Sequence, residues 1–133
     1  MMVAAAVFQL MSTTFKPNAT MPITTVAKDC GGQNISPELH WVNAPANTKS
    51  FTLIIHDPDA PRPGGFTHWT VANIPASTTS LGAGTTLYAG YYGPCPPAGK
   101  VHHYNMTLTA LDANGHVLGQ AKLTGLYATT SPR

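Results

Sequence analysis

Proline and glycine interrupt this chain at short intervals, and no other feature of the sequence restricts its fold as strongly. The 133 residues include 12 prolines and 12 glycines. Proline fixes φ and removes a backbone donor, and glycine weakens a helix interior, so long helices are excluded almost everywhere. The intervening stretches are short and rich in Val, Ile, Thr, Tyr and Phe with period-two alternation, which is typical of strands. We therefore expect a mostly β fold.

The clearest predicted strand covers residues 102–111. There His102, Tyr104 and three apolar residues alternate with polar ones, as in an antiparallel strand with one face on the core. The other predicted strands cover residues 51–57 and 68–74 and, with weaker patterns, residues 8–12, 39–42 and 122–127. This number of short strands predicts an antiparallel β-sandwich with many loops.

The chain is predicted to form one domain, residues 1–133. Its length suits a single hydrophobic core and is too short for two. No internal repeat or domain boundary is visible in the sequence. A short helix of one or two turns is expected at residues 116–121, which begin just after Gly115.

Charged residues are scarce in this sequence. They make up 9% of the chain, against roughly 25% in ordinary soluble domains, and the net charge is +2. The lysines and arginines are scattered singly, whereas nucleic-acid binding needs them clustered, so no nucleic-acid partner is expected. No apolar run approaches the roughly 18 residues of a membrane span, so the chain is not expected to cross a membrane.

The N-terminal segment and the two cysteines bear on the compartment. Residues 1–6 are apolar but lack a basic region and are too short for a signal peptide, which favours a plain N-terminus and a cytoplasmic protein. The alternative is the remnant of a processed signal, with a periplasmic or secreted protein. Cys30 and Cys95 are 65 residues apart, which is no metal-binding spacing. Two buried thiols are expected, and a disulfide that closes a long loop is the alternative.

Four polar side chains stand at the ends of predicted strands, beside loops rich in proline and glycine. Asp57 continues the core-facing side of its strand, where a carboxylate is costly unless it is paired or hydrogen-bonded. His102 and Tyr104 share a face at the start of one strand, and His68 opens another. Binding residues often gather at such positions on a rigid scaffold. A structural role also fits each of them, as a turn cap for Asp57 or a satisfied core residue for a lone histidine.

Longer strings around these residues resemble a known family. The strings are His-Asp-Pro-Asp-Ala-Pro at 56–61, His-Trp-Thr-Val-Ala-Asn-Ile-Pro at 68–75, Gly-Pro-Cys-Pro-Pro at 93–97 and His-His-Tyr at 102–104. They look like the signatures of the phosphatidylethanolamine-binding family, most of all its bacterial and archaeal branch of Raf-kinase-inhibitor-like proteins. The resemblance runs from about residue 8 to residue 127, nearly the whole chain.

The resemblance implies a large antiparallel sheet packed on a smaller one, with an anion pocket at one edge. Carried over to this sequence, the residues that would line the pocket or form its wall are Asp57, His68, His102, Tyr104, Gly93, Pro96 and Pro97, with Asp59 nearby. Imidazole and phenol groups can donate hydrogen bonds to phosphate oxygens. Asp57 can orient a histidine or accept the ammonium of an ethanolamine head group. A small anion or a phospholipid head group is therefore the expected ligand.

This sequence departs from the family's pattern in three places. His103 stands where an arginine is usual and faces away from the pocket on the predicted strand, so a salt bridge of that arginine is expected to be lost. The stretch at 81–91 is short, and a segment that usually lies between Asp112 and Gly115 and forms a helix is missing. A more open pocket and an altered homodimer are the expected consequences.

The function expected from these residues is non-enzymatic binding of a phosphate-bearing anion, without a cofactor. The alternative is an inhibitor or regulator that docks on a kinase or protease through the proline-rich loops at 58–63 and 94–97. Asp57, His68 and His102 also have the composition of a two-histidine, one-carboxylate metal site, but an adjacent general base and a helix-borne histidine pair are lacking. A serine hydrolase would need a Gly-x-Ser-x-Gly elbow, which the sequence does not contain.

Overall fold

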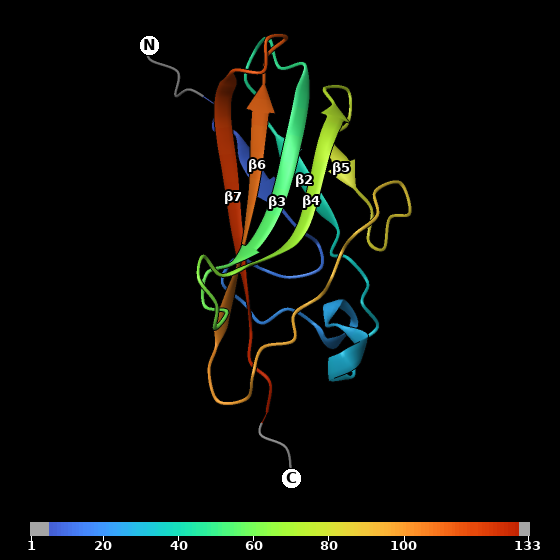
Figure 1. Cartoon of the computed structure of the whole chain (residues 1–133). Coiled ribbons are helices and arrows are strands. Elements are labelled where there is room, and N and C mark those ends of the chain that lie inside the picture. The colour runs from blue at the N-terminus through green and yellow to red at the C-terminus, as the bar shows by residue number, and fades with distance from the viewer. Residues whose placement is uncertain (1–5, 131–133) are drawn as a thin grey trace, which may run out of the picture.

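Two antiparallel sheets make up the computed structural model, which describes residues 6–130 (Figure 1). The larger sheet has the strand order β4-β3-β6-β7, and its strands are β3 (Ser50–Asp57), β4 (Phe66–Pro75), β6 (His102–Leu111) and β7 (Val117–Tyr127). The smaller sheet has the order β1-β2-β5, with β1 (Gln9–Met11), β2 (Leu39–Val42) and β5 (Ser80–Leu81). Two short 3-10 turns, η1 (Ile23–Thr25) and η2 (Lys28–Cys30), precede β2. The predicted sandwich of a large and a small sheet is confirmed.

The hydrophobic core lies between the two sheets because each strand alternates apolar and polar residues. In β3 and β6 every second residue is buried, and Leu53 and Leu108 are fully enclosed. The smaller sheet contributes Trp41, whose ring lies edge-on to Phe51 of the larger sheet with 5.4 Å between centroids. One continuous cluster of buried residues therefore joins both sheets, as expected for a single core.

The predicted strands recur in the structure, several with longer bounds. Residues 102–111 and 39–42 match β6 and β2, while β4 and β7 extend beyond the predicted ranges. The two-residue strand β5 was not predicted, since two residues are too few to show an alternating pattern.

The predicted helix at residues 116–121 is wrong. Most of this segment belongs to β7, where Val117 pairs with Leu111 and Ala121 pairs with Leu108. The pairing with β6 supplies the backbone hydrogen bonds, and Gly119 has a low helix propensity. The turn between β6 and β7 is tight, and in it an Asp112 side-chain oxygen accepts backbone N–H bonds from Asn114 and His116. Strand pairing therefore overrides a weak local helix signal here.

The N-terminal expectation concerns residues 1–6, of which 1–5 lie outside the described residues. Within the described part of the chain, no helix has the length and apolar character needed to cross a membrane.

Three strand ends meet at one end of the larger sheet. Asp57, the last residue of β3, pairs with Phe66, the first residue of β4, and His56 pairs with Asn105 near the start of β6. Figure 1 shows the loop after β3 and the loop before β6 at this same lower end of the sheet. Antiparallel pairing therefore brings together the polar strand ends identified in the sequence.

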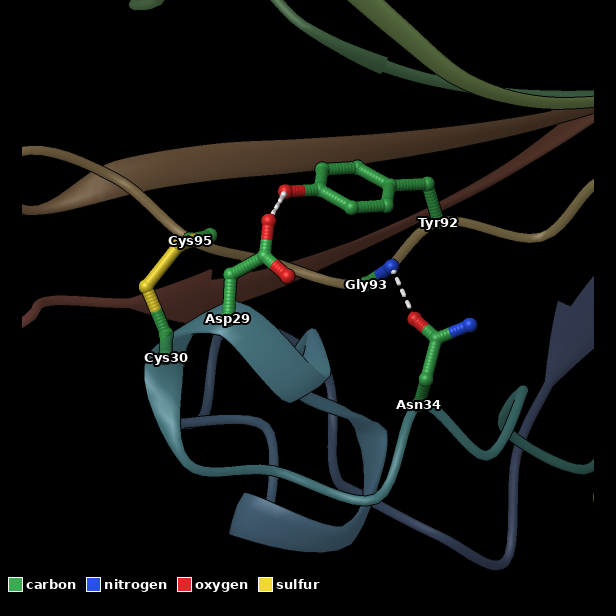
Figure 2. Close-up of a disulfide and its surroundings, with 6 residues drawn as sticks. All are labelled: Asp29, Cys30, Asn34, Tyr92, Gly93 and Cys95. Atoms are coloured by element: carbon green, nitrogen blue, oxygen red, sulfur yellow. Dashed lines mark hydrogen bonds between the residues drawn. A yellow bond between two sulfur atoms is a disulfide. The ribbon is translucent and has the colours of Figure 1, made fainter.

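Cys30 and Cys95 form a disulfide, with their Cα atoms 5.6 Å apart, so the expectation of two buried thiols is wrong. Figure 2 shows that this bond ties η2 to the segment before β6, beside two hydrogen bonds between the same segments. The Tyr92 hydroxyl donates to Asp29 Oδ2 at 3.2 Å, and the Gly93 N–H donates to Asn34 Oδ1 at 2.7 Å. The Ala27 N–H also donates to the Pro94 carbonyl at 3.0 Å, so several contacts support the disulfide, which joins residues 65 apart in sequence.

Gly93 lies where this segment comes very close to the backbone at the end of η1. A Cβ atom built on Gly93 would stand 2.0 Å from the carbonyl oxygen of Thr25. No other residue type fits at that separation, so glycine here serves the contact between the two segments.

We expect removal of the disulfide to lower the free energy of unfolding by about 4 kcal/mol, because the cross-link restricts a long loop of the unfolded chain. The variant with both Cys30→Ser and Cys95→Ser, compared with the oxidised protein by urea unfolding, measures this loss. The wild-type protein in dithiothreitol serves as the control and should lose a similar amount. Equal unfolding free energies for the oxidised protein and the variant would contradict the expectation.

Candidate functional site

A pocket of about 290 Å³ opens at the end of the larger sheet where the three strand ends meet. Its lining consists of Asp57, Ala60, Pro61, Arg62, Phe66, His68, Tyr92, Cys95, Pro96, Pro97, His102 and Tyr104. Six residues of this lining were predicted as ligand-binding from the sequence: Asp57, His68, Pro96, Pro97, His102 and Tyr104. The structure therefore brings together the four polar side chains that carry the hypothesis.

The deepest polar contact of the pocket joins β3 to β6. His102 Nδ1 lies 2.6 Å from Asp57 Oδ2, and both side chains are 3% exposed. An ionised carboxylate only accepts hydrogen bonds, so the Nδ1 atom carries the proton and donates it. The other oxygen of Asp57 accepts the Asp59 backbone N–H at 2.8 Å. Asp57 is thus both paired and hydrogen-bonded, which makes its burial tolerable and orients the histidine ring.

His68 is held by a backbone carbonyl and by three aromatic rings. Its Nδ1 donates to the carbonyl oxygen of Tyr92 at 2.6 Å. The ring lies edge-on to Phe66 and to Tyr104 and stacks on Tyr92, with centroid distances of 4.7, 5.1 and 5.9 Å. Burial lowers the pKa of His68, although the bond to Tyr92 opposes this shift. At neutral pH the ring is therefore uncharged, and its Nε2 atom carries no proton.

Tyr104 presents a hydroxyl group with no hydrogen-bond partner among the described residues, although the side chain is 1% exposed. A buried hydroxyl without a partner costs roughly 1 to 3 kcal/mol, so its position requires an explanation. Burial raises the pKa of Tyr104, and the nearby charge of Asp57 raises it further. The hydroxyl therefore keeps its proton at any physiological pH and remains a donor.

Two of the predicted residues, Asp59 and Gly93, do not line the pocket. Asp59 Oδ2 accepts hydrogen bonds from both the backbone N–H and the Nδ1 atom of His103, each at 2.8 Å. The side-chain bond to His103 is the main reason why the pKa of Asp59 is lowered. His103 is thus hydrogen-bonded to Asp59 outside the pocket, and Gly93 contributes through its close packing against Thr25.

Sequence reasoning missed six residues of the lining: Ala60, Pro61, Arg62, Phe66, Tyr92 and Cys95. A signal existed for Phe66, which lies two residues before His68 in β4 and so shares its face. Arg62 lies in the loop that leaves β3, beside the motif that was identified. Tyr92 and Cys95 reach the pocket only because the disulfide and its neighbouring bonds hold their segment in place, which no local pattern shows.

A metal centre is not formed by these side chains. Within residues 6–130, no three His, Cys, Asp or Glu side chains are placed to hold a metal ion. The two-histidine, one-carboxylate arrangement considered from the sequence is therefore not present in that part of the chain.

We expect Asp57→Ala to lower the free energy of unfolding by about 3 kcal/mol, because it leaves the buried His102 ring without its acceptor. Asp59→Ala is the matched control. It also removes a histidine partner, but the His103 side chain is 53% exposed, so a loss below about 1 kcal/mol is expected. Urea unfolding of both variants measures the difference, and equal losses would contradict the structural importance of the buried pair.

Comparison with known proteins places this geometry in a family. The profile of the family described as phosphatidylethanolamine-binding protein matches residues 11–128. The UPF0098 protein YbcL of Escherichia coli is 41% identical over an alignment that covers 80% of this chain and 70% of YbcL. A UPF0098 protein of Methanothermobacter thermautotrophicus is 40% identical, with 74% of this chain and 85% of that protein covered. A relative in Mycobacterium tuberculosis, LppC, is 35% identical over 79% of this chain and is named as a lipoprotein.

A solved structure shows the same fold. The crystal structure of E. coli YbcL, described as a new member of the mammalian PEBP family, superposes with a TM-score of 0.84 at 34% identity. The superposition covers 92% of this chain and 99% of YbcL. Sequence and fold agree over nearly the whole length, and the chain belongs to the phosphatidylethanolamine-binding protein family.

Proposed function

We propose that this protein binds a small phosphate-bearing anion in the pocket at the end of the larger sheet and catalyses no reaction on it. The observation that carries the proposal is the hydroxyl of Tyr104, which is buried in the pocket lining and has no partner among the described residues. A phosphate oxygen is a strong acceptor, so such a ligand would satisfy this donor.

The two histidines supply the other donors. Each has its Nδ1 atom occupied, in His68 by the carbonyl of Tyr92 and in His102 by Asp57. Only the Nε2 atom of each ring is left for a ligand, and it donates a hydrogen bond when it carries a proton. When both rings are doubly protonated, two Nε2 donors and one hydroxyl would give an oxyanion three contacts from two strands, with His68 on β4 and His102 and Tyr104 on β6.

The composition of the lining supports binding without catalysis. The described residues that line the pocket include no serine, threonine or lysine, and the sulfur of Cys95 is held in the disulfide. Asp57 is occupied by His102 and by the Asp59 backbone, so it is poorly placed to act as a general base. Among the described residues of the lining, no serine, threonine, lysine or free thiol is therefore available as a nucleophile.

When an anion binds, His68 should take up a proton. Burial lowers the pKa of the free histidine, and a bound anion near the Nε2 atom would raise it. The affinity should therefore rise as the pH falls through the interval between the raised bound pKa and the lowered free pKa, and it should level off below that interval.

Titration with sodium sulfate at pH 5.5 and pH 7.5 tests the proposal, because sulfate keeps its charge over this range. We expect the histidine ring signals of His68 and His102 in nuclear magnetic resonance spectra to shift, with tighter binding at pH 5.5. His116, which is 78% exposed in the turn before β7, is the internal control and should not follow the saturation curve.

Tyr104→Phe removes only the hydroxyl and should weaken sulfate binding about tenfold. The proposal fails when neither His68 nor His102 responds to sulfate or inorganic phosphate. Tighter binding at pH 7.5 would refute the protonation of His68.

We also propose that the protein works in an oxidising compartment, the periplasm or the outside of the cell, rather than in the cytoplasm. Disulfides persist in such compartments and are rare where thiols are kept reduced. The Cys30–Cys95 bond and the lipoprotein name of the mycobacterial relative support this proposal. Alkylation of thiols in intact cells should leave both cysteines unlabelled until a reductant is added; immediate labelling of both would refute it.

A further inference from the structure

We propose that Arg62 makes this pocket select phosphate groups that carry no neighbouring ammonium, such as alkyl phosphate monoesters, over phosphoethanolamine. The inference rests on the proposed anion site and names the class of ligand that the site prefers. It departs from the expectation that Asp57 accepts the ammonium of an ethanolamine head group.

Arg62 packs against an aromatic ring of the pocket lining. Its guanidinium carbon lies 4.9 Å from the centroid of the Phe66 ring, a cation–π distance. Phe66 in turn lies edge-on to His68, with 4.7 Å between ring centroids. All three residues belong to the pocket lining. The exposed guanidinium therefore lies against Phe66 at the mouth of the pocket, and among the described residues no side-chain hydrogen bond occupies its N–H groups.

The charge of Arg62 is not balanced by any acidic side chain. Of the five acidic residues, four pair with a histidine, in the pairs Glu38–His40, Asp57–His102, Asp59–His103 and Asp112–His116. The fifth, Asp29, accepts the Tyr92 hydroxyl. Among residues 6–130 the Arg62 guanidinium forms no ion pair with a carboxylate, so its positive charge is free to attract an anion at the pocket.

An ammonium group would find no free carboxylate in this pocket. Asp57 is the one acidic residue of the described lining, and each of its oxygens already accepts a hydrogen bond. Its side chain is 3% exposed, and its charge faces the His102 ring. An ammonium beside a bound phosphate would therefore be repelled by Arg62, and the burial of Asp57 would limit the compensating contact with that carboxylate. A phosphate with an alkyl substituent would keep the attraction and avoid the repulsion.

Propyl phosphate and phosphoethanolamine form the matched pair of probes, because they have similar sizes and differ in a terminal methyl or ammonium group. Isothermal titration at pH 6.5 should show propyl phosphate binding about fivefold more tightly to the wild-type protein. Arg62→Gln should weaken propyl phosphate binding about tenfold and bring the two affinities close together. Arg62→Lys, which keeps the charge but not the planar donor group, should retain a preference for propyl phosphate.

Lys122→Gln is the control, since it removes the same charge from an exposed position of β7 outside the pocket. It should leave both affinities unchanged. Equal or tighter binding of phosphoethanolamine to the wild-type protein, or an unchanged ratio in Arg62→Gln, overturns the role of Arg62 while anion binding itself stands. Absence of binding by both probes overturns the proposed function together with this inference.

Discussion

The hydrogen-bonded pair of Asp57 and His102 is the contact on which the pocket depends. A carboxylate at the end of an apolar strand would be costly to bury alone, and the imidazole 2.6 Å away on the next strand makes its burial tolerable. The same contact uses the Nδ1 atom of His102 and leaves its Nε2 atom for a ligand. Because β3 and β6 are neighbours in the sheet, the backbone ladder holds both partners in place, and the orientation of His102 follows from the fold rather than from a flexible loop.

The opposite wall of the pocket depends on covalent and steric constraints. The segment around Tyr92 and Cys95 has no strand of its own, and it meets the larger sheet through hydrogen bonds between Tyr92 and His68. The disulfide to Cys30, two hydrogen bonds to residues 29–34 and the close approach of Gly93 to Thr25 hold its other side. A loop that is ordered before binding loses little conformational entropy when a ligand arrives, which favours affinity.

Charge is scarce in this chain, and most of its acidic side chains share one kind of partner. Four of the five carboxylates lie against histidines. His103 pairs with Asp59 outside the pocket. Against this background the permanent charge of Arg62, stacked on Phe66 at the pocket, stands apart from the histidine pairs.

Local sequence was sufficient to predict the strands around residues 51–57 and 102–111 and the polar residues at their ends, because a period of two places alternate side chains on one face whatever the rest of the chain does. The family resemblance added which of these residues share a pocket. Tertiary structure decided the remainder: residues 116–121 became a strand because β6 offered a partner, and Cys30 met Cys95 because two distant loops pack together. Tyr92 joined the lining for the same reason. Contacts between segments far apart in sequence leave no periodic pattern in either segment, so only the folded chain reveals them.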